Sequence, residues 1–145
     1  MNKFKITFLL IGTLLIVSCN GKAQSNKTAI QQNQNQIEVL DFYGTHRCFT
    51  CKAIEENTRY TLETHFSDAL KSEKIVFKTI NVDEKENETI AEKFEAVGTA
   101  LLLNVIKDGK ETVIDLTELA FMDGTEQEVF SKKLKTKIET ELIKL

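Results

Sequence analysis

The stretch Ile37–Lys52, IEVLDFYGTHRCFTCK, decides the fold of this chain. Its first seven residues, 37–43, are mostly apolar, which predicts a strand that is buried on both faces. A short loop follows, and then Cys48 and Cys51 are separated by only two residues. Apolar residues at helical spacing come next and predict a helix over residues 48–72. We therefore expect the cysteine pair where a strand leads into the first turn of a helix.

The pattern beyond this stretch predicts a further alternation of strands and helices. These elements are strands over 75–82, 100–106 and 111–116, a helix around 90–94 that ends near Gly98, an Asp-Gly turn over 107–110, and a last helix that begins at Thr125 or Glu126. The order β-α-β-α-β-β-α predicts an α/β protein with a mixed central sheet of about four strands sandwiched by helices.

The composition limits the classes of function that the chain can serve. Its 145 residues have a formal net charge of −3 and no block rich in Lys or Arg, so we expect no nucleic-acid partner. Three cysteines are too few for a disulfide scaffold but enough for one paired site.

The N-terminal segment has the features of an export signal. Residues 1–18 carry two lysines and then an apolar run over 6–17, which is too short for a comfortable membrane span. The sequence IVSC at 16–19 resembles the lipobox of bacterial lipoproteins. In that class the signal is cut before the cysteine, whose thiol receives the lipid, so the resemblance implies a lipidated Cys19. A plain signal peptide with a chance cysteine is the alternative.

The chain is thus expected to have three parts. Residues 1–18 are the signal peptide that is removed, residues 19–36 are the lipidated cysteine with a polar, Gln/Asn-rich flexible tether, and residues 37–145 are one folded domain. Its lipid would bind a membrane of the cell envelope. A periplasm-facing location in a Gram-negative bacterium is the corresponding prediction.

The chemistry of the cysteine pair follows from its predicted place at a helix N-terminus. Unpaired N–H groups and the helix dipole stabilise a thiolate there, and Arg47, Lys52 and His46 add positive charge. Two intervening residues on the first helical turn bring both sulfurs within disulfide distance. We expect Cys48 to be the exposed nucleophile and Cys51 to be the sheltered sulfur that resolves a mixed disulfide.

Two segments resemble the thioredoxin superfamily. VLDFYGTHRCFTCK at 39–52 is similar to its strand, loop and Cys-x-x-Cys motif, and residues 80–111 are similar to its later half with an Asp-Gly hairpin. The resemblance implies a thioredoxin-like fold that lacks the leading strand and helix of the full version. It also puts Asp41 near the buried acid that accepts a proton from the second cysteine. A simple strand-end aspartate is the alternative for Asp41.

The chain departs from the thioredoxin pattern at two places. Phe49 and Thr50 stand between the cysteines where Gly-Pro is usual, and Thr99 or its neighbour stands where the family has a cis-proline. A cis bond before a residue other than proline costs about 3–4 kcal/mol, so we expect trans bonds there. The candidates for substrate contact are Tyr43, His46, Phe49 and Thr50, which lie near or within the motif, and Thr99, which the resemblance implies to face the cysteines. For Tyr43, a place in the core is the alternative.

A second resemblance concerns the substrate. THRCFTCKAIEENT at 45–58 and LETHF at 62–66 resemble small thioredoxin-like subunits of nitrophenyl-compound (nitrophenyl-arsenical) reductase systems. Reduction of a nitro group to an amine takes six electrons and one dithiol supplies two, so this role requires a redox partner. No cofactor is expected.

Two other functions remain open at this stage. Cys48 and Cys51, with His46 as a third ligand, could bind a soft metal ion or trivalent arsenic. Alternatively, the pair could be a static disulfide in a docking domain without catalysis.

Overall fold

The computed structural model describes residues 35–145. The predicted signal peptide, Cys19 and the tether up to residue 34 lie outside this part. The elements are β1 (Gln36–Tyr43), α1 (Phe49–His65), α2 (Ser67–Lys71), β2 (Ile75–Asn81), a short 3-10 helix η1 (Lys85–Asn87), α3 (Glu88–Lys93), β3 (Ala100–Lys107), β4 (Lys110–Asp115), α4 (Thr117–Asp123) and α5 (Gln127–Leu142).

The four strands form one mixed sheet in the order β2-β1-β3-β4. β1 is parallel to β2 and antiparallel to β3, and β4 returns antiparallel to β3. The β3–β4 turn has Asp108 at φ 51° and Gly109 at φ 75°, the paired positive values that an Asp-Gly hairpin turn requires. β1 is therefore an interior strand with a hydrogen-bonded neighbour on each side.

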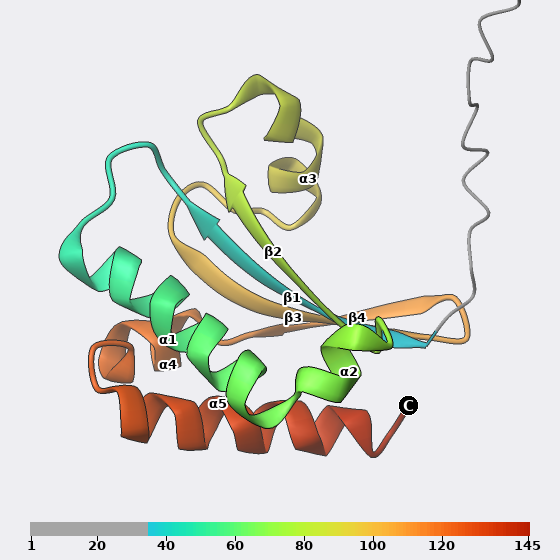
Figure 1. The fold of residues 1–145 in the computed structure, drawn as a ribbon. Coiled ribbons are helices and arrows are strands. Elements are labelled where there is room, and N and C mark those ends of the chain that lie inside the picture. The colour runs from blue at the N-terminus through green and yellow to red at the C-terminus, as the bar shows by residue number, and fades with distance from the viewer. Residues whose placement is uncertain (1–34) are drawn as a thin grey trace, which may run out of the picture. The chain divides into compact units, whose positions relative to one another are not determined.

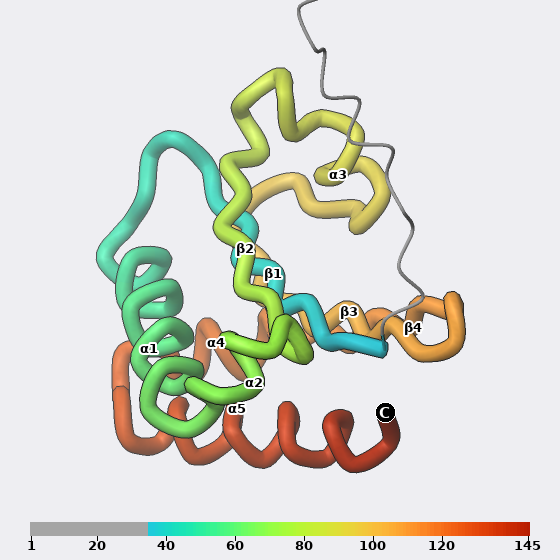
Figure 2. Tube along the Cα trace, turned by 45° about the vertical axis from the view of Figure 1, so that its right-hand side comes forward, coloured from blue at the N-terminus to red at the C-terminus, as the bar shows by residue number. Residues whose placement is uncertain are grey.

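Helices cover both faces of the sheet (Figure 1). α1, α4 and α5 pack on one face, and α5 contributes the fully buried stripe Phe130, Leu134 and Ile138. α3 lies on the opposite face, as the turned view in Figure 2 also shows. There Leu40 and Phe42 of β1 join a smaller apolar cluster. Alternate residues of β1 thus enter two cores, as its apolar sequence predicts.

The α3 side of the sheet also holds a polar network. The amide of the fully buried Asn104 donates to Glu38 at 2.8 Å and to Glu111 at 2.9 Å. Lys78 binds Glu38 at 2.5 Å, and Lys93 of α3 binds Glu111 at 2.7 Å. The hydrogen bond from Lys93 lowers the pKa of Glu111. This face therefore carries an apolar cluster and, beside it, a network of paired charges that includes Lys93 of α3.

The predicted fold class is confirmed, with differences in detail. The helix predicted over 48–72 is interrupted at Phe66, which ends α1 and precedes α2. α4 was not predicted because seven residues give too little periodicity. β1 begins at Gln36, one residue before the predicted start, and Asn35 hydrogen-bonds to the carbonyl of Leu145 at 3.2 Å.

None of the helices within residues 35–145 is both long and apolar enough to cross a membrane.

The turn between α4 and α5 is fastened to α1. Asn57 of α1 donates to the carbonyl of Gly124 at 2.8 Å and accepts a hydrogen bond from Gln127 at 3.0 Å. A Cβ atom at Gly124 would lie 2.2 Å from the carbonyl oxygen of Ala120 and 2.6 Å from Cγ1 of Ile54. The close approach of this turn to the helix that carries the cysteines therefore requires glycine.

Gly124→Ala is expected to lower the free energy of unfolding by about 1–3 kcal/mol, because the added methyl group overpacks the contact with α1. Gly98→Ala is the control, since its Cβ would meet no atom within 4 Å. Urea denaturation of both variants measures the difference. Equal stability of the two variants would contradict the packing described here.

Candidate functional site

Cys48 and Cys51 form a disulfide at the start of α1. Their Cα atoms are 5.2 Å apart, and Cys48 is the N-cap residue, whose Sγ accepts a hydrogen bond from the backbone N–H of Cys51 at 3.2 Å. Cys48 is exposed, whereas Cys51 is buried. The structure thus exposes one cysteine and buries the other, which is the arrangement that the nucleophile and resolving roles need.

The first turn of α1, which carries the cysteine pair, contains no acidic residue. Phe49 is 79% exposed, Thr50 is half-buried, and Lys52 is exposed. The two residues between the cysteines are therefore accessible to a partner. Helix N–H groups at this end can stabilise charge on Cys48.

Arg47 joins the loop before Cys48 to three parts of the site. Its guanidinium binds the carboxylate of Glu55, donates to the carbonyl of Cys51 at 2.9 Å and lies 3.7 Å from the carboxylate of Asp41. It also lies over the ring of Tyr43 at 4.2 Å, which is cation–π distance. Arg47 is thus paired with carboxylates, whereas the sequence suggested a cation that supports the Cys48 thiolate.

Asp41 is fully buried at the end of β1. Within residues 35–145, neither of its carboxylate oxygens has a hydrogen-bond partner. Burial raises the pKa of Asp41 from its ordinary value of 3.8 to about 7, and the nearby Arg47 opposes this rise. Asp41 is therefore a buried group that can exchange a proton near neutral pH. Its role as proton acceptor for Cys51 stays a prediction.

Thr99 lies beside the buried cysteine, and its predicted contact with a substrate stays a prediction. Its hydroxyl donates to Sγ of Cys51 at 3.4 Å. Both peptide bonds next to Thr99 are trans. Thr99 therefore supplies a side-chain donor to the buried sulfur.

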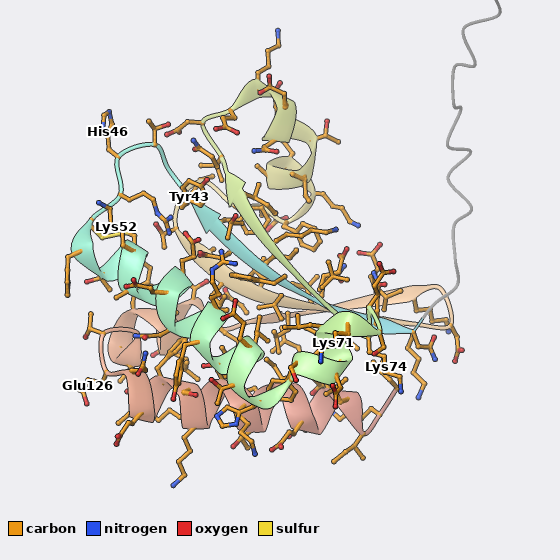
Figure 3. The ribbon with its side chains drawn as sticks, viewed as in Figure 1. Tyr43, His46, Lys52, Lys71, Lys74 and Glu126 are labelled. Carbon is orange, nitrogen blue, oxygen red and sulfur yellow. A yellow bond between two sulfur atoms is a disulfide. The ribbon has the colours of Figure 1, made fainter. Side chains whose placement is uncertain are left out.

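The remaining candidates lie around the loop after β1, where Figure 3 labels Tyr43, His46 and Lys52. Tyr43 is half-buried under Arg47, and His46 is exposed. No three His, Cys, Asp or Glu side chains in the described part of the chain form a group that could hold a metal ion. With the Cys48–Cys51 disulfide closed, His46 and the two cysteines form no such group, and a metal site at the reduced pair stays a prediction.

Sequence reasoning missed three residues that order the site, namely Glu55, Arg59 and Asp83. Glu55 binds both Arg47 and Arg59; although its partial burial works against ionisation, these hydrogen bonds lower the pKa of Glu55. Asp83 accepts the backbone N–H of Thr45 at 2.7 Å, which lowers the pKa of Asp83. The four-residue spacing of Glu55 and Arg59 was the one available signal for these contacts.

Asp41→Asn is expected to raise the free energy of unfolding of the oxidised protein at pH 8, by up to about 4 kcal/mol for a pKa shift of about three units. Between pH 4 and pH 7 the folded wild-type protein retains a proton that the unfolded chain has lost. Wild-type stability therefore falls as the pH rises through this window, and the advantage of the variant grows.

Urea denaturation at pH 5 and pH 8 measures this difference. Asp68→Asn, at an exposed carboxylate of α2, is the control and should show no such gain. A loss of stability in Asp41→Asn that is equal at both pH values would contradict the assignment.

Thr99→Val is expected to lower the reduction potential of the pair by about 10–30 mV. The lost hydrogen bond, of about 0.5–1.5 kcal/mol, destabilises the reduced state more than the oxidised state. The reduced sulfur is the better acceptor. Thr99→Ser keeps the hydroxyl and is the matched control. Equilibration in glutathione buffers, read by thiol alkylation and mass, measures the potentials. An unchanged potential in Thr99→Val would show that the contact has no redox effect.

Comparison with known proteins identifies structural neighbours only. No family model and no curated relative matches the chain. The thioredoxin of Fasciola hepatica is 22% identical, with 66% of this chain and 84% of that chain covered and a TM-score of 0.43. The oxidised mitochondrial thioredoxin 3 of Saccharomyces cerevisiae is 26% identical, with 65% and 80% covered and a TM-score of 0.41.

These structural similarities are low. The thioredoxin-like fold therefore stands on this chain's own strand order, its helix layers and the position of Cys48 and Cys51, which together support a thiol–disulfide redox function.

Proposed function

We propose that the protein exchanges disulfides with a redox partner through Cys48 and Cys51. In the reduced protein, the Cys48 thiolate attacks a sulfur of the partner disulfide, and the first partner thiolate leaves. Cys51 then loses its proton and attacks the Cys48 sulfur, which releases the second partner thiol and closes the Cys48–Cys51 bond. Two electrons pass to the partner, and the reverse sequence reduces this protein.

The observation that carries the proposal is the unequal exposure of Cys48 and Cys51 at the start of α1. An exposed Cys48 can meet a partner, and a buried Cys51 can reach only the Cys48 sulfur, so that it resolves the mixed disulfide by releasing the partner's sulfur. Asp41, whose pKa is about 7, is suited to accept the proton that Cys51 must lose.

A purely structural disulfide is less consistent with this position. The stabilising effect of a disulfide grows with the length of the loop that it closes, and only two residues separate these cysteines. Such a bond constrains little of the unfolded chain.

The cellular setting is part of the proposal. A lipid on Cys19 would hold the domain at the periplasmic side of a cell-envelope membrane. The similarity of residues 45–58 to nitrophenyl reductase subunits favours a multi-electron reductase system as the partner. In such a system this protein would pass electrons two at a time.

A reduction potential between about −120 and −270 mV is expected for the Cys48–Cys51 pair, the range of working oxidoreductases. When the partner is present, the Cys51→Ser variant should accumulate a mixed disulfide with it through Cys48. The Cys48→Ser variant should accumulate none. The potential is measured on the full chain with Cys19 replaced by serine, so that one pair titrates.

A potential well below about −300 mV would indicate a static disulfide and contradict the proposal. Stoichiometric binding of arsenite by the reduced pair, without turnover of any disulfide, would instead support the binding-module alternative.

A further inference from the structure

We infer that Cys48 reacts preferentially with disulfides that carry a carboxylate close to the reacting sulfur, an inference that rests on the exchange function proposed above. The reason is an open hollow beside Cys48, with a volume of about 510 Å³. Its lining residues are Thr45, His46, Arg47, Cys48 and Lys52. No carboxylate lines it, and an entering substrate group would meet basic side chains.

Lys52 is the cation that is free to bind a substrate. Its side chain is exposed and forms no ion pair or hydrogen bond with any residue in the range 35–145. Arg47 also lines the hollow, but its charge is balanced by Asp41 and Glu55. An incoming carboxylate would therefore gain most from Lys52.

The carboxylate of Asp83 is hydrogen-bonded to the backbone of Thr45, one of the residues that line the hollow. Asp83 accepts the backbone N–H of Thr45 at 2.7 Å, and this hydrogen bond, together with the nearby His46, lowers the pKa of Asp83. In addition, the first turn of α1 carries no acidic residue. Lys52 and the dipole at the N-terminus of α1 therefore both stabilise a negative charge beside Cys48.

The preference acts in the first step of exchange. When the Cys48 thiolate attacks a disulfide, one substrate sulfur becomes bonded to Cys48 and the other leaves as a thiolate. A carboxylate that is separated from the reacting sulfur by one or two methylene groups can then lie in the hollow near Lys52. A substrate with an ammonium group at the same place would be repelled.

The test compares three small disulfides as substrates of the reduced full chain with Cys19 replaced by serine. Dithiodipropionate carries two carboxylates, cystamine carries two ammonium groups, and hydroxyethyl disulfide is neutral. Each rate constant is divided by that of free dithiothreitol with the same disulfide. The ratio of anionic to neutral rates within one variant cancels any effect on the reactivity of the Cys48 thiolate itself.

The wild-type ratio is expected to exceed one, and Lys52→Gln should lower it by about fivefold, the effect of one charge at about 4 Å in water. Lys52→Glu should lower it further and favour cystamine. Lys74→Gln is the matched control, since Lys74 is also an exposed lysine without an ion pair among the described residues. Figure 3 shows Lys74 far from Lys52.

Equal normalised rates for the three disulfides would overturn the preference alone. An equal loss in Lys74→Gln would also overturn it, because the effect would then come from net charge and not from the hollow. No reaction with any of the three disulfides would overturn the exchange function itself.

Discussion

The burial of β1 on both faces is the constraint on which the rest of the structure depends. This strand has a hydrogen-bonded neighbour on each side and a helical layer above and below. Alternate side chains must therefore enter one core or the other, and Asp41 falls on an inward position near the end of the strand. A carboxyl group is thereby removed from water next to the cysteine motif, and its ionisation becomes costly.

Arg47, which is itself paired with Glu55, partly compensates the buried carboxyl group of Asp41. A guanidinium between Asp41 and Glu55 offsets part of the cost of charge, and its bond to the carbonyl of Cys51 fixes the start of α1. The same side chain covers Tyr43. Packing, charge balance and the placement of the disulfide are therefore coupled through one residue that directly precedes Cys48.

The sequence predicted the elements with strong local patterns and missed those that depend on distant contacts. The apolar runs of the strands, the Asp108-Gly109 turn and the four-residue repeat of α5 are local and were predicted correctly. α4 is too short to show a period. The pairing of Arg47 with Asp41 could not be predicted, because it depends on how the loop after β1 folds back. Thr99 was found only through the resemblance to thioredoxins, since it lies 48 positions after Cys51 in the sequence.

The hydrogen bond between Asn35 and Leu145 has a consequence for how the domain can be held. It brings the first described residue and the last one together at the beginning of β1, whereas Cys48 follows the end of that strand. Eight residues of strand span about 25 Å. Any attachment through the chain before residue 35 would therefore hold the domain at the end of β1 opposite to Cys48, a position called here the distal pole. A hold on the domain at that pole would therefore leave the surface around Cys48 uncovered.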